Sequence, residues 1–362
     1  MGLELAIKGY SRQFRQPLKT AHGPWQKRQG LLVRLEDGLG RVGYGEIAPL
    51  PWFGSETLAA AQAFCKSLAK VPLWPAPLPF GLACDPAGPE ANPDLLREGR
   101  RFSSLTLPNS LPATQFGLAT AMAQLQGQGV AAVPSPEPHA SFICGLLPAG
   151  AAALKGWPAL WQSGTRTFKW KIGVDGIATE RALLTTLVQA LPPTSRLRLD
   201  ANGGLTVSEA AQWLDLCDRL NSQPDTCAIE FLEQPLPPDQ VAVMAHLGQR
   251  FRTAIALDES VATLPSLERC HQQGWSGIFV VKPALAGCPH RLRQFWQRHS
   301  PQLVFSSAFE TVVGRQAALA LAADYAAQLP PSAPPLALGF GTLDWFEDNW
   351  DSLTPTQLWD SL

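Results

Sequence analysis

Residues 168–172 read Phe-Lys-Trp-Lys-Ile, a short β-type run whose last charged side chain is Lys171. Five further runs of this kind follow along the chain, and each ends on a charged or polar residue. The six strand-end residues lie 24 to 33 positions apart and are Lys171, Asp200, Glu233, Asp258, Lys282 and Ser306. Stretches with helical spacing separate the runs. Strands that alternate with helices at this interval predict a parallel sheet.

Six or more strand–helix units favour closure of the sheet into a (β/α)8 barrel. The alternative is an open doubly wound sheet, but no Gly-x-Gly-x-x-Gly turn follows an early strand to support it. We therefore predict an α/β protein with a TIM-like (β/α) barrel over residues 131–330. Residues 331–362 are expected to add the last barrel strand and a tail. Residues 1–130 are expected to form an α+β capping domain together with that tail.

The N-terminal third carries hairpin patterns instead of strand–helix units. Residues 30–38 form an apolar run closed by Asp-Gly, and residues 42–46 resemble the returning strand of a hairpin. Helices are predicted over 55–70, with Ser55 as the cap, and over 115–125. Two proline-rich stretches, 71–112 and 133–138, are predicted to be irregular, the second as a linker. The aromatic residues expected to pack the tail on the cap are Trp345, Phe346, Trp350 and Trp359.

Composition narrows the class of protein. The 362 residues are 46% hydrophobic with a formal net charge of -1, which excludes a disordered chain and argues against nucleic-acid or polybasic membrane binding. No apolar run reaches the roughly 18–20 residues of a membrane span, and the first residues show no secretory signal. Seven cysteines without a Cys-x-x-Cys pair indicate reduced thiols in a cytoplasmic protein. Six scattered histidines argue against a zinc site, and no obligatory protein partner is indicated.

Alternation along the first run places its two lysines on one face. At a period of two residues, Lys169 and Lys171 point to one side of the strand and Trp170 to the other. In a barrel the lysines face the interior and Trp170 packs under the helices. The alternative is an exposed edge strand with solvated lysines. Two like charges aimed into a barrel are costly, so the barrel interpretation predicts a site that needs them.

Three carboxylates, Asp200, Glu233 and Asp258, end three consecutive runs. The ends of neighbouring strands meet at the barrel mouth, where these side chains are expected to converge. Such a cluster needs a cation, and an all-oxygen set favours Mg²⁺ over zinc or copper. A single Asp at such a position is more often a helix cap, but three at one-unit spacing favour a site. Glu259 follows Asp258 directly, and strand alternation does not decide which of the two is the ligand.

Lys282 ends the fifth run, across the predicted barrel from Lys171. A lysine near a metal ion and a second lysine is expected to have a lowered pKa, which suits a general base. Lysines on opposite walls with a metal between them are what proton abstraction next to a carboxylate requires. Arg198 also faces the predicted interior, and we expect it to pair with Glu233 or Asp258 instead of meeting substrate.

Five motifs together resemble the muconate-lactonizing subgroup of the enolase superfamily. They are F-K-W-K at 168–171, L-D-A-N at 199–202, F-L-E-Q-P at 231–235, L-D-E-S at 257–260 and V-K-P at 281–283. The resemblance covers nearly the whole barrel and implies a Mg²⁺ site, with Mn²⁺ as a substitute. The residues it implies are the metal ligands Asp200, Glu233 and Asp258, the acid–base lysines Lys171 and Lys282, and the supporting residues Lys169 and Asn202.

Two segments, 45–51 and 305–314, resemble the o-succinylbenzoate synthase family of that superfamily. The resemblance implies a small-molecule carboxylate substrate, 2-succinyl-6-hydroxy-2,4-cyclohexadiene-1-carboxylate, dehydrated through an enediolate in menaquinone or phylloquinone synthesis. It implies that Lys171 removes the α-proton and that Lys282 stabilises the anion by cation–π contact. It also gives Ser306 and Ser307 as contacts to the succinyl carboxylate, with a helix N-cap as the alternative for both. The loop 20–24, with His22, is expected to close the mouth.

The same lysine–metal–lysine site suits other reactions. An N-succinylamino acid racemase would use the same residues, and a muconate-type cycloisomerase is the next alternative. A third class is a non-catalytic binding protein built on the same barrel. The presence of all three carboxylates and both strand-end lysines argues against that class.

Overall fold

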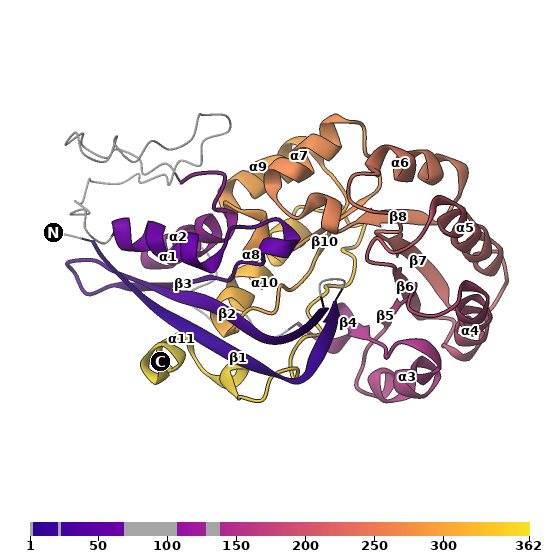
Figure 1. Ribbon diagram of the computed structural model, residues 1–362, viewed down its shortest axis with the longest axis horizontal. Coiled ribbons are helices and arrows are strands. Elements are labelled where there is room, and N and C mark those ends of the chain that lie inside the picture. Colours follow the sequence, from indigo (N-terminus) through magenta and orange to yellow (C-terminus); the bar gives the residue numbers. More distant parts are fainter. Residues whose placement is uncertain (1–2, 21–22, 69–106, 128–137) are drawn as a thin grey trace.

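Two sheets, one antiparallel and one parallel, form the frame of the molecule in the computed structural model (Figure 1). The structure describes residues 3–20, 23–68, 107–127 and 138–362. The predicted irregular segment 71–112 lies outside the described residues up to 106, and so does nearly all of the linker 133–138. The predicted domain boundary at residues 130 and 131 also lies outside them, so the domain limits stay a prediction.

The parallel sheet has seven strands in chain order, as the spacing of the sequence runs predicts. The strands are β4 Cys144–Leu146, β5 Thr167–Lys171, β6 Arg196–Asp200, β7 Ala228–Glu233, β8 Ala254–Leu257, β9 Ile278–Val281 and β10 Leu303–Phe305. All six predicted runs are confirmed to within about one residue at each end. The sequence pattern did not identify β4, which has only three residues.

A short eighth segment closes this sheet into a ring. Leu338 forms a parallel bridge with Ile143, just before β4, and Gly339 forms one with Ser306, just after β10. The Cys144 N–H donates to the Leu338 carbonyl at 2.8 Å, and the Gly339 N–H donates to the Phe305 carbonyl at 2.8 Å. The two edges of the sheet are therefore joined, and the barrel is confirmed over the open doubly wound sheet. This segment is the last strand that was expected within residues 331–362.

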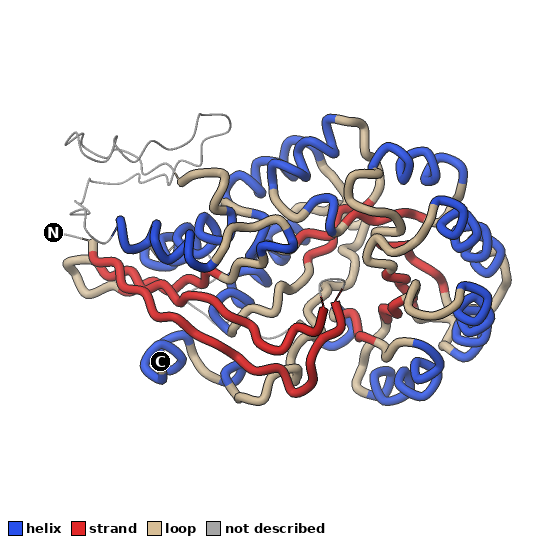
Figure 2. Tube along the Cα trace, in the orientation of Figure 1, coloured by secondary structure: helices blue, strands red, loops and turns tan. Residues whose placement is uncertain are grey.

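Helices cover the outside of the ring (Figure 2). They are α3 Ala153–Gln162, α4 Ile177–Ala190, α5 Val207–Asn221, α6 Val241–Arg250, α7 Leu264–Gln272, α8 Pro283–Ala286, α9 Pro289–His299 and α10 Val312–Ala326. The capping box of α5 joins Thr206 and Glu209. No helix in the described residues is both long and apolar enough to cross a membrane.

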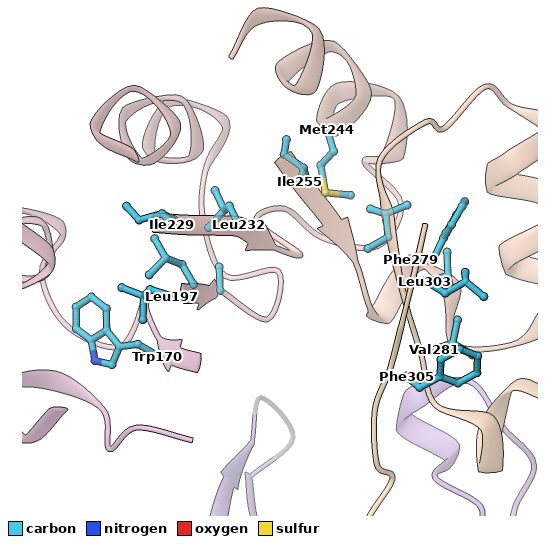
Figure 3. Packing of buried hydrophobic residues seen from close by; sticks show 14 of the residues in the cluster. Trp170, Leu197, Ile229, Leu232, Met244, Ile255, Phe279, Val281, Leu303 and Phe305 are labelled. Carbon is cyan, nitrogen blue, oxygen red and sulfur yellow. The ribbon is translucent and has the colours of Figure 1, made fainter. Parts of the chain in front are cut away.

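Alternate strand residues face the helices and the barrel interior. The outward set packs under the helices and includes Trp170, Leu197, Leu232, Ile255 and Phe279 (Figure 3). The inward set forms a separate cluster of Phe231, Ala256, Ile278, Val280 and Val304. Trp170 is fully buried between strand and helices, while Lys169 and Lys171 on either side of it are only half-buried. The predicted division of β5 into a lysine face and a tryptophan face is therefore confirmed.

The antiparallel sheet belongs to the cap and consists of β1 Glu4–Thr20, β2 Gly23–Glu36 and β3 Val42–Ile47. The predicted hairpin is confirmed, because β2 and β3 pair across a turn in which Asp37 Oδ1 accepts from the Leu39 and Arg41 N–H groups. Helix α2, Pro112–Leu125, packs directly against β3. A Cβ at Gly45 would come within 1.9 Å of the Gly117 carbonyl oxygen, so only glycine allows this approach.

The other predicted cap helix is α1, Leu58–Leu68, and its expected cap was wrong. Thr57, not Ser55, supplies the hydroxyl at its start and accepts from the Ala60 N–H at 3.1 Å. Ser55 instead turns back and accepts from the Leu50 N–H at 2.6 Å. Both residues are hydroxyl side chains ahead of the helix, so the sequence alone could not choose between them.

The tail packs on the cap, as its aromatic residues predict. Phe346 stacks on Phe14 of β1 with ring centroids 4.6 Å apart, and these two residues also form an antiparallel bridge. Helix α11, Pro355–Ser361, lies beside the cap sheet (Figure 1). Its Trp359 joins a cluster with Tyr10 and Leu32 of that sheet. The tail therefore fixes the cap hairpin from the side opposite to α2.

Arg12 provides the strongest polar link between the hairpin and the tail. Its guanidinium is buried, pairs with Asp348 at 2.7 Å and Asp351 at 3.0 Å, and lies 3.8 Å from the Phe346 ring centroid. Both pairs use two nitrogen–oxygen contacts. This planar fork fits arginine and not lysine.

We predict that Arg12→Met lowers the free energy of unfolding by about 3 kcal/mol. The mostly buried carboxylates of Asp348 and Asp351 would then lose the guanidinium that pairs with them. Urea denaturation measures this change, and limited proteolysis should release the tail earlier. The control is Arg219→Met, which removes the exposed Arg219–Asp215 pair of α5 and should change stability by less than about 0.5 kcal/mol. Equal effects of the two variants would contradict the prediction.

Candidate active site

The strand ends place two lysines on opposite walls of the barrel. In the ring formed by the seven strands and the closing segment, β5 and β9 are four positions apart. Lys171 ends β5, and Lys282 follows β9. Strands β6, β7 and β8 lie between them and end near Asp200, Glu233 and Asp258. The fold therefore places a lysine, three carboxylates and a second lysine around one barrel mouth, in the predicted order.

Lys169 holds two of the carboxylates together. Its ammonium lies 2.7 Å from Asp200 Oδ2 and 2.8 Å from Glu233 Oε1. Burial by itself lowers the pKa of Lys169, but the charges of Asp200, Glu233 and Asp258 outweigh it and hold that pKa well above its ordinary value. Lys169 is therefore a fixed cation at the floor of the site.

The three carboxylates do not share the same electrostatic environment. Burial is the largest effect on Glu233 and, with the charges of Asp200 and Asp258, raises its pKa to about 7 against the attraction of Lys169. Burial likewise raises the pKa of Asp258 to about 6, against the attraction of Lys282. For Asp200, burial opposes ionisation, but Lys169 prevails and lowers the pKa. Crowded carboxylates of this kind are stabilised by any additional cation.

Both candidates at the end of β8 face the site. Asp258 forms an ion pair with Lys282. Glu259 Oε1 accepts from Asn202 Nδ2 at 3.2 Å, and Asn202 N–H in turn donates to Asp200 Oδ1 at 3.1 Å. Glu259 Oε2 is buried without a hydrogen-bond partner among the described residues. Asn202 adopts a left-handed φ of 44°, which lets one residue reach both carboxylates.

The two opposite lysines differ in their contacts. Lys282 is held by Asp258 on one side, and its ammonium lies 4.0 Å from the centroid of the Phe53 ring on the other. Lys171 is half-buried and forms no hydrogen bond or ion pair with any residue that the structure describes. Of these two lysines, Lys171 is therefore the one without such a contact among the described residues.

The donor set fits a hard divalent cation. Three carboxylates from adjacent strands supply only oxygen ligands, which suits Mg²⁺. Among the described residues no three metal-binding side chains converge closely enough to coordinate a metal ion as they stand. The reason is visible in the contacts: the Lys169 ammonium lies between Asp200 and Glu233, and Lys282 engages Asp258. These lysines show where the carboxylates accept positive charge.

The paired serines after β10 do not cap a helix, so that alternative was wrong. Helix α10 begins at Val312, and its N-cap is Thr311. The Ser307 hydroxyl donates to Glu310 at 2.6 Å and accepts from the Phe309 N–H, whereas half-buried Ser306 donates to the Gly339 carbonyl at 3.2 Å. Ser307 is therefore engaged within its own loop, and Ser306 is the serine nearer to solvent.

The expected surroundings of Arg198 have a definite outcome. Arg198 does face the interior, but its predicted partners were wrong: it pairs with Glu230 at 2.6 Å and donates to the Ala337 carbonyl. The pairing of β6 with β7 shifts register between Leu197 and Arg198 of β6, so that Arg198 lies opposite Phe231 and Glu230 is the extra residue of β7. Glu230 and Phe231 therefore both face inward, and this bulge supplies a partner that simple alternation does not predict. His22 of the predicted mouth loop lies outside the described residues.

Comparison with known proteins identifies the class of the protein. Residues 155–332 match the enolase C-terminal domain-like family, and residues 13–74 match the MenC N-terminal domain. An o-succinylbenzoate synthase of Thermosynechococcus vestitus is 42% identical over 93% of this chain and 91% of its own, and one of Edwardsiella ictaluri is 32% identical over 86% and 82%. The crystal structure of o-succinylbenzoate synthase from Thermosynechococcus elongatus BP-1, complexed with Mg in the active site, aligns with a TM-score of 0.79 at 39% identity, covering 99% of this chain and 100% of that one.

These matches, with the capped barrel, place the chain in the enolase superfamily. The superfamily resemblance indicated by the strand-end motifs is thereby confirmed. Within that superfamily, the chain belongs to the o-succinylbenzoate synthase family.

Sequence reasoning missed one residue that shapes the site, Gln234. It follows Glu233, is fully buried and has a left-handed φ of 36°. Its amide donates to Ser260 Oγ and the Leu236 carbonyl, each at 2.8 Å, and accepts from the Asp258 N–H at 3.0 Å. Gln234 thus joins the ends of β7 and β8. The only sequence signal was its place in the F-L-E-Q-P motif, where the adjacent glutamate drew attention first.

We predict that Gln234→Leu lowers the free energy of unfolding by about 3 kcal/mol. Leucine fills the volume but leaves the buried N–H groups of Asp258 and Ser260 without an acceptor, at about 1–3 kcal/mol each. Urea denaturation measures the loss. The matched control is Gln273→Leu at the exposed end of α7, which should leave stability nearly unchanged. A loss at Gln234 no larger than that at Gln273 would refute the bridging role.

Proposed function

We propose that this chain is an o-succinylbenzoate synthase, a carbon–oxygen lyase that converts 2-succinyl-6-hydroxy-2,4-cyclohexadiene-1-carboxylate to 2-succinylbenzoate in menaquinone or phylloquinone synthesis. The observation that carries the proposal is the site itself: Lys171, which has no ion pair among the described residues, faces Lys282 across three carboxylates. The similarity to synthases over nearly the whole chain supports the choice of substrate.

Asp200, Glu233 and Asp258 are the proposed ligands of Mg²⁺, and Mn²⁺ is a proposed substitute because it accepts the same oxygen ligands. When bound, the metal ion would hold the substrate carboxylate and offset the negative charge that develops on it. Asn202 supports this set through its contacts with Asp200 and Glu259. Lys169 supports it by fixing Asp200 and Glu233 in place.

The proposed chemistry divides between the two opposite lysines. Lys171, which no described carboxylate holds, takes the proton from the carbon next to the substrate carboxylate as a neutral amine. It then returns that proton to the departing hydroxyl, which leaves as water, and the ring becomes aromatic. Lys282 stays an ammonium beside Asp258 and stabilises the anion through its charge. The 4.0 Å distance from this ammonium to the centroid of the Phe53 ring supports a cation–π role.

Ser306 is the proposed contact for the succinyl carboxylate. Ser306 is half-buried at the barrel mouth, and its hydroxyl donates a hydrogen bond to the Gly339 carbonyl. Ser307 is proposed to support the loop from behind through Glu310. The substrate is thus a small-molecule carboxylate. A cytoplasmic location is proposed because the six described cysteines are all free and buried.

The first experiment follows dehydration of the cyclohexadiene substrate by its loss of absorbance. We expect fast turnover with Mg²⁺, none with EDTA, and recovery with added Mg²⁺ or Mn²⁺. Lys171→Ala should lower kcat at least 10³-fold while Mg²⁺ binding by calorimetry stays within a few fold, because the base is lost but the carboxylates remain.

An absence of dehydration together with α-proton exchange on N-succinylamino acids would move the function to the racemase alternative. If neither dehydration nor α-proton exchange is detected, a catalytic role for this site with these substrates is excluded.

Two neighbouring variants decide which carboxylate of β8 is the ligand. We predict that Asp258→Asn raises the Kd for Mg²⁺ more than 100-fold. Glu259→Gln should raise it only about 10-fold, the usual effect of a group that supports a ligand from behind. Calorimetric titration with Mg²⁺ measures both values without turnover. The reverse order would assign the ligand role to Glu259.

A further inference from the structure

A buried arginine of the cap, Arg28 on β2, joins two separate loops through contacts with their backbone carbonyls. Its guanidinium donates to the Ala308 carbonyl at 3.0 Å and to the Pro49 carbonyl at 2.8 Å, and also to the Ala48 carbonyl. The side chain is 1% exposed. Ala308 lies in the barrel loop that follows Ser306 and Ser307, whereas Ala48 and Pro49 begin the loop after β3. Arg28 therefore connects the cap loop to the barrel loop.

The cap loop that Arg28 holds leads directly to the catalytic mouth. After Pro49 the chain forms the 3-10 turn Pro51–Phe53, in which the Phe53 N–H donates to the Leu50 carbonyl at 2.8 Å. Gly54, with a φ of 101°, ends this turn. The turn places the Phe53 ring 4.0 Å from the Lys282 ammonium. Phe53, whose ring contacts Lys282, thus lies only five positions after Ala48, whose carbonyl Arg28 holds.

The strand before this loop is anchored to the barrel independently. Glu46 of β3 is fully buried and accepts from the Thr311 N–H and the Gly314 N–H, each at 2.9 Å, at the start of α10. A carboxylate at a helix N-terminus is stabilised by the unpaired N–H groups there. Glu46 fixes the start of the loop, and Arg28 fixes its course toward Phe53.

We propose that Arg28 is a positioning residue for the reaction, which sets the Ala48–Phe53 loop so that Phe53 covers Lys282. The proposal rests on the proposed function, since it assigns Lys282 its role. Arginine is required because its rigid fork reaches several carbonyls at once, whereas a lysine ammonium on a flexible stem cannot hold the same three. The structural alternative is that Arg28 only stabilises the cap and has no specific effect on Lys282.

The kinetic test compares Arg28→Lys with Arg34→Lys on the same strand, whose guanidinium pairs with Glu36 near the surface. We expect Arg28→Lys to lower kcat about 10-fold while the Kd for Mg²⁺ stays within twofold, because the carboxylates are untouched. Arg34→Lys should leave kcat unchanged. Loss of Mg²⁺ binding in parallel with kcat would overturn the proposal in favour of a general structural role.

A double-mutant cycle tests whether Arg28 acts through Phe53. We expect Phe53→Leu alone to lower kcat by a similar factor, and Arg28→Lys to change kcat less than twofold when added to Phe53→Leu. Additive effects would mean that the two residues act independently, which overturns the proposal. Thermal unfolding of each variant shows whether it is folded at the assay temperature.

A third measurement needs no substrate and separates this proposal from the proposed function. Acetic anhydride labels accessible lysines, and mass spectrometry gives the rate at Lys282. We expect Arg28→Lys and Phe53→Leu to raise that rate at least threefold, and Arg34→Lys to leave it unchanged. An unchanged rate in Phe53→Leu overturns the proposal even if Arg28→Lys does not fold. If the wild-type protein dehydrates no substrate, the proposed function fails while labelling still decides the role of Arg28.

Discussion

The site depends on the contact of one ammonium, that of Lys169, with the carboxylates of Asp200 and Glu233. Three buried carboxylates at one barrel mouth repel one another, and burial raises the pKa of Glu233 to about 7. Lys169 offsets part of this cost from below, and Lys282 does so from the side through Asp258. Lys169 and Lys282 thus form ion pairs with the three carboxylates, whereas Lys171 has no ion pair among the described residues.

The cap is joined to this barrel by buried polar contacts as well as by apolar packing. Glu46 accepts N–H groups at the start of α10, Arg28 donates to loop carbonyls on both sides, and Arg12 fixes the tail. Each of these groups is buried, so each requires its partners in place. Such contacts have a narrow range of acceptable geometries. They therefore restrict the position of the Phe53 loop over the mouth more than apolar packing alone would.

The sequence predicted the barrel and the strand-end groups because both follow from local periodicity. A period of two residues separated Lys169 and Lys171 from Trp170, and the spacing of β–α units put the carboxylates at one edge. Features that depend on one extra residue in a strand or on one unusual backbone angle were not predictable from this periodicity. The bulge that turns Glu230 toward Arg198 breaks the alternation, and the left-handed φ of Gln234 has no pattern of its own. The contact of Phe53 with Lys282 joins positions 229 residues apart, and no local rule reaches that far.

The contrast between Lys171 and Lys282 bears on the choice between dehydration and racemisation. A racemase needs two lysines that exchange roles, since each must be able to give and take a proton on its own face of the substrate. Here the Lys282 ammonium lies 4.0 Å from the centroid of the Phe53 ring, whereas Lys171 has no ring contact, hydrogen bond or ion pair among the described residues. One mobile base and one fixed cation suffice for a dehydration in which the same lysine removes a proton and protonates the leaving hydroxyl. The asymmetry of the two walls thus favours a synthase over a racemase on the same scaffold.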